Sequence, residues 1–302
     1  MGDLKDFAPV YEFLRDYQSL FAQYAAYMIG TYYWDEHSWE VPVIVFHEIN
    51  GVNISCWVGS EDFSDGKKSL VFVHGSGGDH RIWIKQYTKL KDEFNIAVID
   101  LPGHGQSEGA GEQNVSLYVE WAKMLLDSFA LQKPVLIGHS LGAAISLVFA
   151  IQYGERLSGV VPVGGGVRMP VNEMILKGLK TEPEFVIGII AKFSVSKENR
   201  ERLMRTVIDG LSCTSPEVLY GDLLACDRLD ITGQVSRIRI PALVLCGTDD
   251  KMTPPALSQF LGDNIPGARM SLIENAGHMV MLENADAFNR LLKDFVESLP
   301  VI

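Results

Sequence analysis

The sequence predicts an α/β fold, with a mostly parallel central sheet covered by helices on both faces and an inserted helical subdomain. One observation is that short, nearly continuous apolar runs alternate with longer helical patterns, as parallel strands buried on both faces do. The runs are Leu70–Val73, Ile96–Ile99, Val135–Ile137, Val160–Val163, Leu243–Leu245 and Met270–Ile273. The other observation is a break in this alternation between Gly164 and about Ser236, where only helical stretches occur.

The chain divides into three parts on this pattern. Residues 1–40 are expected to form an aromatic-rich helical extension, because apolar residues recur there at three- and four-residue steps. These residues are Tyr11, Phe13, Leu14, Tyr17, Leu20, Phe21, Tyr24 and Met28. Their face is expected to pack on the main body or on a second subunit, so a homodimer through residues 1–40 is one hypothesis. Residues 41–164 and 237–302 are expected to form the core, and residues 165–236 the helical subdomain.

The core is expected to begin with a β-hairpin. Two strand-like segments, from Val43 and from Val52, flank the dipeptide Asn50-Gly51. Asn-Gly between such segments is the strongest short-range hairpin signal, because both residues tolerate the positive φ angles that a tight turn needs.

Charge and composition exclude several functions. Lys and Arg number 26 against 38 Asp and Glu, a net charge of −12, which excludes the broad basic surface of a nucleic-acid-binding protein and disfavours anionic membranes. The four cysteines lack CxxC spacing, so neither a zinc site nor a disulfide framework is expected. No signal-peptide pattern occurs, and the apolar stretches are shorter than the ~20 residues that span a bilayer. We therefore expect a cytoplasmic protein that acts on a small molecule.

The pentapeptide Gly138-His139-Ser140-Leu141-Gly142 carries the clearest chemical signal. It follows a strand-like run and precedes a helical pattern, Ala143–Tyr153. A sharp turn between strand and helix crowds the backbone around the serine, so the flanking positions must be glycine. Such a turn raises the hydroxyl group of Ser140 above the edge of the sheet, where a base can reach it. Ser140 is therefore the candidate nucleophile.

A serine hydroxyl needs a base to accept its proton, and the base needs an acid to orient it. In sheets of this kind the order along the chain is serine, acid, histidine. Two later strand-like runs end in polar residues, the first before Asp249 and Asp250 and the second before His278. His278 is the best placed of the seven histidines, and both aspartates remain candidates for the acid on this reasoning.

A glycine-rich loop, His74 to Gly78, ends another strand-like run at the same edge. Acyl transfer passes through an oxyanion that backbone N–H groups stabilise. We expect these groups to be the N–H of Leu141, which follows the nucleophile, and that of Ser76 in this loop. A phosphate-binding loop is disfavoured because both the GxGxxG and the GK[ST] patterns are missing.

These motifs resemble the α/β-hydrolase superfamily over residues 43–300. They are His74-Gly75-Ser76-Gly77, Asp100-Leu-Pro-Gly-His-Gly-Gln-Ser107, Gly138-His-Ser-Leu-Gly142 and Gly277-His278, in the order of the family. The resemblance implies that Asp250, rather than Asp249, is the acid and that residues 165–236 form a cap over the active site. It also implies two-step acyl transfer by Ser140, His278 and Asp250, with neither metal nor organic cofactor.

The leading hypothesis is a serine hydrolase of carboxylic esters with small, neutral, hydrophobic substrates. A thioesterase, a carbon–carbon bond hydrolase, and a perhydrolase or lyase variant are alternatives on the same triad, and a ligand receptor with this fold is an alternative of another class. Ser140 excludes the haloalkane dehalogenases and epoxide hydrolases, which carry an aspartate nucleophile. The net charge of −12 ranks neutral esters above coenzyme A thioesters.

The predicted cap contains many apolar residues that either line a substrate pocket or pack the cap onto the core. They are Met169, Met174, Ile175, Leu176, Phe185, Ile187, Ile189, Ile190 and Phe193.

Overall fold

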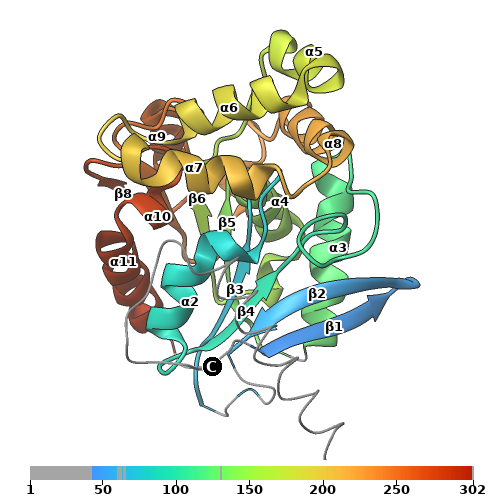
Figure 1. The fold of residues 1–302 in the computed structure, drawn as a ribbon. Coiled ribbons are helices and arrows are strands. Elements are labelled where there is room, and N and C mark those ends of the chain that lie inside the picture. The colour runs from blue at the N-terminus through green and yellow to red at the C-terminus, as the bar shows by residue number, and fades with distance from the viewer. Residues whose placement is uncertain (1–42, 60–62, 64–65, 130, 301–302) are drawn as a thin grey trace, which may run out of the picture. The chain divides into compact units, whose positions relative to one another are not determined.

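The computed structural model describes residues 43–59, 63, 66–129 and 131–300 (Figure 1). The predicted helix within residues 1–40, and the dimer contact expected of it, lie outside the described residues. Eight strands form one sheet in the order β1-β2-β4-β3-β5-β6-β7-β8. Their bounds are β1 Val43–Ile49, β2 Val52–Val58, β3 Ser69–Val73, β4 Asn95–Ile99, β5 Val135–His139, β6 Gly159–Val163, β7 Leu243–Gly247 and β8 Arg269–Ile273.

The predicted hairpin is confirmed. Strands β1 and β2 pair in antiparallel register from Val43 opposite Val58 to Ile49 opposite Val52. The two residues between them, Asn50 and Gly51, have φ angles of 54° and 77°. Positive φ at both positions gives the strands the twist that a two-residue turn needs.

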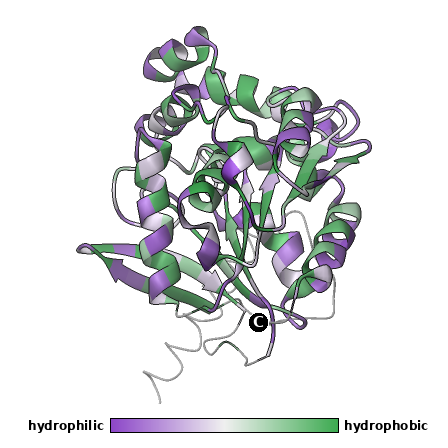
Figure 2. Cartoon of the chain, turned by 180° about the vertical axis from the view of Figure 1, so that it is seen from behind, coloured by the Kyte–Doolittle hydropathy of each residue, from purple (hydrophilic) through white to green (hydrophobic). Residues whose placement is uncertain are grey.

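The mostly parallel sheet is also confirmed, since each predicted apolar run forms a strand and β3 to β8 pair in parallel. Successive residues of β3 enter opposite hydrophobic clusters: Val71 and Val73 lie in one, and Leu70 and Phe72 in the other. This alternation, with period two, explains why the strands are apolar without interruption. Figure 2 shows the central strands mostly in green, for hydrophobic residues, among helices that carry both purple and green residues.

Helices cover both faces of the sheet, as predicted. Helices α3, α4 and α9 contribute to the first cluster, and α2, α10 and α11 to the second. Their bounds are α2 Ile84–Leu90, α3 Val115–Ser128, α4 Leu141–Tyr153, α9 Pro255–Asn264, α10 Val280–Glu283 and α11 Ala285–Ser298, with the 3-10 helices η2 His80–Trp83, η3 Gly154–Arg156 and η4 Val235–Arg237. In the described part of the chain, no helix has the length and apolarity needed to cross a membrane.

Four further helices follow β6 and precede β7, in the stretch that breaks the strand alternation. They are α5 Glu173–Thr181, α6 Pro183–Ser194, α7 Arg200–Leu211 and α8 Pro216–Asp227. Proline stands in the first turn of α6 and α8, where its missing N–H is harmless, and Ser215 caps α8 by accepting from the Val218 N–H. Figure 1 shows these helices together, in yellow and orange, above the ends of the central strands. We refer to residues 165–236 as the insertion.

The backbone is most crowded where β5 turns into α4. A Cβ added to Gly138 would lie 1.9 Å from the carbonyl oxygen of Gly142, and one added to Gly142 would lie 2.4 Å from that of Val73. Both obstacles are backbone atoms, which cannot rotate away as a side chain can.

Gly138→Ala should therefore lower the free energy of unfolding by about 3 kcal/mol. The matched control is Gly188→Ala inside α6, where an added Cβ meets nothing within 4 Å. That substitution should raise stability by about 0.5–1 kcal/mol, because alanine favours helix. Urea unfolding followed by circular dichroism measures both, and equal stability of the two variants would contradict this account of the turn.

Candidate active site

Ser140 occupies the turn between β5 and α4 with φ 54° and ψ −111°. Residues with a Cβ adopt such angles rarely, and only where the surrounding structure holds them there. The Ser140 N–H donates to the carbonyl oxygen of Val163 on β6 at 2.9 Å, which fixes the turn to the neighbouring strand. The side chain is partly exposed, at the carboxyl edge of the parallel strands where ligands bind in open α/β sheets.

Asp250 and His278 form a buried pair. Asp250 follows β7, His278 follows β8, and the His278 Nδ1 lies 2.9 Å from the Asp250 Oδ2. The other oxygen of Asp250 accepts from the N–H groups of Met252 at 2.9 Å and Thr253 at 2.8 Å. Burial alone would raise the pKa of Asp250, but His278 and the donors from Thr253 together hold it below its usual value. Asp250 is therefore a carboxylate that fixes the orientation of the His278 ring.

Asp249 differs from its neighbour. Its side chain is exposed and, among the described residues, accepts no hydrogen bond; only its N–H is engaged, with the carbonyl oxygen of Ala276 at 2.9 Å. Of the two aspartates that the sequence leaves open, the structure brings Asp250 to His278.

Ser140 and His278 lie on the same edge of the sheet without a hydrogen bond between their side chains in the described residues. His139, the residue before Ser140, contacts His278: the two ring centroids are 4.6 Å apart, and the His139 Nε2 lies 3.0 Å from the His278 carbonyl oxygen. Gly164 also packs against His278, since an added Cβ there would lie 3.2 Å from the His278 Nδ1. Catalytic hydrogen bonds are often long until substrate binds.

His139 contacts His278 directly, and the sequence reasoning missed it. Because a carbonyl oxygen can only accept, the Nε2 of His139 carries a proton and donates a hydrogen bond to the backbone carbonyl oxygen of His278. Burial and the neighbouring His278 keep the pKa of His139 well below its usual value, so the ring is neutral. The motif contains this residue, but the pattern Gly-x-Ser-x-Gly leaves its position unspecified.

The loop from His74 to Gly78 packs directly on the Ser140 turn. A Cβ on Gly75 would lie 3.0 Å from the Cβ of Ser140. The carbonyl oxygen of Gly75 accepts from the Gly78 N–H at 3.0 Å and from the His74 Nδ1 at 2.8 Å, while the His74 Nε2 accepts from the Leu101 N–H at 3.0 Å. Burial lowers the pKa of His74 to about 4, so this ring is neutral.

Among the described residues, two backbone N–H groups near the Ser140 turn lack a protein acceptor. In the described part of the chain the N–H of Ser76 donates to no protein group. The N–H of Leu141 opens α4, and the first N–H groups of a helix have no acceptor within it. These are the two donors that the sequence predicts.

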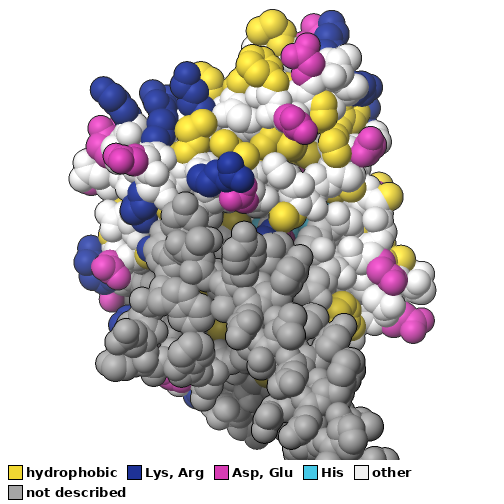
Figure 3. Space-filling model, in the orientation of Figure 1, with side chains coloured by type: hydrophobic (Ala, Val, Ile, Leu, Met, Phe, Trp, Pro, Cys, Tyr) yellow, Lys and Arg dark blue, Asp and Glu magenta, His cyan; other side chains and the backbone are white. Residues whose placement is uncertain are grey.

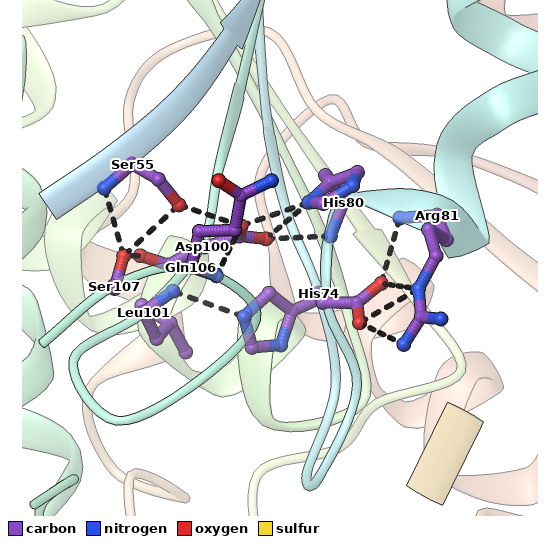
Figure 4. A network of polar contacts seen from close by, with 9 residues as sticks. Ser55, His74, His80, Arg81, Asp100, Leu101, Gln106 and Ser107 are labelled. Carbon is purple, nitrogen blue, oxygen red and sulfur yellow. Dashed lines mark hydrogen bonds and ion pairs between the residues drawn. The ribbon is translucent and has the colours of Figure 1, made fainter. Parts of the chain in front are cut away.

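Asp100 organises the motif Asp100–Ser107 from inside the protein (Figure 4). Its oxygens accept from the His80 N–H at 2.7 Å, the Ser55 hydroxyl at 2.7 Å and the Gln106 N–H at 3.3 Å. The hydroxyl of Ser107 donates to the Asp100 carbonyl oxygen at 2.7 Å. The acid of this motif therefore holds several loops together.

The apolar residues that the sequence assigns to the cap divide into two sets. Ile187 and Ile190 are buried in a cluster with core residues, whereas Met174 and Phe185 are 74% and 65% exposed. Figure 3 shows yellow apolar side chains over α5 and α6, among blue and magenta charged ones. Part of the set thus packs the insertion onto the core, as one of the two sequence interpretations expects.

A separate pocket of about 280 Å³ lies at the amino ends of β7 and β8, lined by Arg239, Pro266, Arg269 and Phe295 among others. Because these strands are parallel to β5, this is the edge of the sheet opposite Ser140. No group of three or more His, Cys, Asp or Glu within the described residues could hold a metal ion.

An α/β hydrolase has a serine in a strained strand-to-helix turn and an aspartate and a histidine that follow two later strands of the same, mostly parallel sheet. This chain has that arrangement. A sequence model of the alpha/beta hydrolase family matches residues 70–291, and the chain belongs to this family.

Relatives of the chain include hydrolases with different substrates. It is 28% identical over 257 residues to a 2-hydroxy-6-oxononadienedioate/2-hydroxy-6-oxononatrienedioate hydrolase of Paraburkholderia phymatum, covering 78% of this chain and 89% of that protein. It is 24% identical over 247 residues to a pimeloyl-acyl-carrier-protein methyl ester esterase of Neisseria meningitidis, covering 77% and 78%. Among solved structures, a thermophilic esterase is 32% identical with a TM-score of 0.74, covering 87% of this chain and all (100%) of that one.

The Asp100 network predicts a loss of stability on a nearly isosteric change. Asp100→Asn turns one acceptor oxygen into a donor that faces buried donors, so the free energy of unfolding should fall by about 3 kcal/mol. The control, Glu108→Gln, alters an exposed carboxylate of the same loop that accepts from the Asn53 N–H, and should change stability by less than about 1 kcal/mol. Thermal unfolding measures both. Unchanged stability of Asp100→Asn would refute the structural role.

Proposed function

We propose that the protein is a serine hydrolase that cleaves carboxylic esters of small, neutral, hydrophobic substrates through an acyl-enzyme intermediate. The observation that carries the proposal is the buried pair of Asp250 and His278, 2.9 Å apart, at the edge of the sheet that also presents the strained Ser140. Membership of the alpha/beta hydrolase family and similarity to two ester hydrolases support it.

The first step is acylation of Ser140. Because the His278 Nδ1–H is donated to Asp250, the Nε2 is left with a lone pair that accepts the proton of the Ser140 hydroxyl as its oxygen attacks the ester carbonyl carbon. The carbonyl oxygen becomes an oxyanion and accepts from the N–H groups of Ser76 and Leu141. His278 then gives its proton to the alcohol oxygen as the ester bond breaks.

The second step releases the acid. Water gives a proton to His278 and attacks the acyl carbon, a second oxyanion forms, and Ser140 leaves with the proton returned to its oxygen. Throughout the cycle Asp250 remains ionised and stabilises the imidazolium of His278, because its lowered pKa keeps it a carboxylate. Each oxyanion donor contributes about 3–4 kcal/mol to such transition states.

The insertion is proposed to act as the cap of this site, because it contacts loops on two sides of Ser140. At the end of α6, the carbonyl oxygen of Ser194 accepts from the His278 N–H at 2.9 Å. Before α8, the Thr214 hydroxyl donates to the Gly77 carbonyl oxygen at 3.0 Å. Substrate selection is therefore assigned to the insertion, and the net charge of −12 favours neutral substrates.

Carbon–carbon bond hydrolysis is the second candidate. The Paraburkholderia phymatum relative is named as a hydrolase of 2-hydroxy-6-oxononadienedioate, a substrate of the carbon–carbon bond hydrolases. The two candidates differ in the substrate's charge and in the bond that is broken. The two candidates are separated by measuring hydrolysis rates on p-nitrophenyl butyrate and on a 2-hydroxy-6-oxodienoate, each followed by the change in absorbance. The proposal predicts the higher kcat/KM for the neutral ester, and the reverse order would favour the second candidate.

Ser140→Ala tests the nucleophile. The variant should lower kcat for p-nitrophenyl butyrate by at least about 10³-fold, because the attacking oxygen is lost while the rest of the site remains. Ser146→Ala, on the same helix and away from the turn, is the control and should retain activity. A Ser140→Ala protein with nearly full activity would reject the proposed function.

The two adjacent aspartates form a matched pair for the acid. Asp250→Asn should lower kcat by about 10³- to 10⁴-fold, because an amide no longer holds His278 in the required tautomer. Asp249→Asn should leave kcat within about twofold, since the Asp249 side chain is exposed. Steady-state kinetics at pH 7 measures both variants, and equal losses would contradict the assignment of Asp250.

A further inference from the structure

Asp222 is a fully buried carboxylate that belongs to α8 of the insertion but binds donors from the core alone. Its Oδ2 accepts from the Gly77 N–H at 2.8 Å and lies 2.8 Å from the His104 Nε2. Its Oδ1 accepts from the Tyr118 hydroxyl at 2.5 Å. Gly77 follows β3, His104 follows β4 and Tyr118 belongs to α3, so one side chain joins the insertion to three parts of the core.

The contacts of His104 favour its protonated, cationic form. Its Nε2 faces the Asp222 carboxylate, and its Nδ1 lies 3.0 Å from the carbonyl oxygen of Pro102. A carboxylate and a carbonyl oxygen both accept hydrogen bonds, so both contacts are satisfied when both ring nitrogens carry protons. Burial by itself would lower the pKa of His104, but Asp222 and the Pro102 carbonyl outweigh it and raise the pKa above its usual value. Asp222 and His104 are thus a buried ion pair.

The insertion holds both polar backbone groups of Gly77. Asp222 accepts from its N–H, and the Thr214 hydroxyl donates to its carbonyl oxygen at 3.0 Å. Gly77 has φ 64°, and a Cβ there would lie 2.8 Å from the side chain of Leu219 on α8. The insertion therefore holds the two peptide groups that flank the Cα of Gly77, one through its N–H and the other through its carbonyl oxygen.

Ser76 lies between two peptide groups that are held in this way. The carbonyl oxygen of Gly75, in the same peptide group as the Ser76 N–H, accepts from His74 at 2.8 Å and from Gly78 at 3.0 Å. The next peptide group presents the Gly77 N–H to Asp222 at 2.8 Å. The core thus fixes one side of Ser76 and the insertion fixes the other, while the Ser76 N–H itself stays unused by the described protein groups.

We propose that Asp222 is a positioning residue of the oxyanion hole: from the insertion, paired with His104, it fixes the Gly77 peptide and thereby aims the Ser76 N–H at the carbonyl oxygen of the substrate. This inference rests on the proposed function, since it requires an oxyanion formed by attack of Ser140. Hydrolysis then requires that the insertion is packed on the core. The insertion contributes to stabilising the oxyanion as well as to selecting the substrate.

The ion pair also gives the site a pH dependence. Groups that face His104 are Asp222, His74, Asp100 and, through Asp222, Tyr118. His74, whose ring centroid lies 4.8 Å away, is neutral and adds no charge. When pH rises through the raised pKa of His104, its Nδ1 loses the proton and faces the Pro102 carbonyl with a lone pair. The contribution to stability is thus complete below about pH 6.5 and is lost as pH rises through that pKa.

Asp222→Asn tests the inference, with Asp227→Asn as the matched control. Asp227 lies on the same helix, is exposed, and accepts from the Val171 N–H inside the insertion. Asp222→Asn should lower kcat for p-nitrophenyl butyrate about 10- to 100-fold with KM within twofold, because a misaimed donor weakens the transition state more than substrate binding. Asp227→Asn should match the wild type. The wild-type kcat should also fall at alkaline pH as His104 is deprotonated, and this fall should be missing from Asp222→Asn.

The contrary outcomes are distinct. The inference would be overturned, and the proposed function left intact, if folded Asp222→Asn kept the wild-type kcat or changed only by a higher KM. The same holds if its pH profile kept the wild-type shape, or if Asp227→Asn lost as much kcat. Activity that survives in Ser140→Ala would reject the proposed function and this inference together. If Asp222→Asn fails to fold, Tyr118→Phe decides, since it removes one hydrogen bond to Asp222 and keeps the ion pair: a severalfold lower kcat at constant KM supports the inference, and wild-type kinetics overturns it.

Discussion

The strained turn at Ser140 is the constraint on which the rest of the site depends. A non-glycine residue at φ 54° is unfavourable by about 1–3 kcal/mol, and it persists because the backbone around it leaves no room to relax. Gly138 and Gly142 approach other backbone atoms more closely than any side chain allows, and the Ser140 N–H is held by β6. The buried sheet thus supplies the stability that keeps the serine oxygen at its edge.

Around this turn the site is assembled from loops that are far apart in sequence. Asp250 and His278 meet because β7 and β8 are parallel neighbours, so their carboxyl ends deliver both side chains to one place. The insertion contacts the same edge of the sheet at two points: the Ser194 carbonyl oxygen accepts from the His278 N–H, and Asp222 accepts from the Gly77 N–H. We infer that the insertion selects the substrate and also completes the geometry of the oxyanion hole.

Much of this was predictable because strand runs and turn motifs are local signals. The six apolar runs, the Asn50-Gly51 turn and the placement of Ser140 and His278 at one edge follow from residue spacing alone. Residue spacing left both Asp249 and Asp250 open, because the choice depends on which side chain the loop turns inward, and it was the resemblance to the family that implied Asp250. Asp222 was beyond sequence reasoning altogether: it is a single acid in a helical pattern, and its partners Gly77 and His104 lie 145 and 118 residues away.

Reaction with a fluorophosphonate, followed by mass spectrometry of the digested protein, tests whether His278 activates Ser140 as a nucleophile. The phosphorus takes the place of the carbonyl carbon, the Ser140 oxygen bonds to it, and fluoride leaves. We expect one phosphonyl group per chain, located on Ser140, and none when His278 is replaced by alanine. Labelling at another residue, or labelling of Ser140 at the same rate without His278, would contradict the proposal that His278 activates this serine.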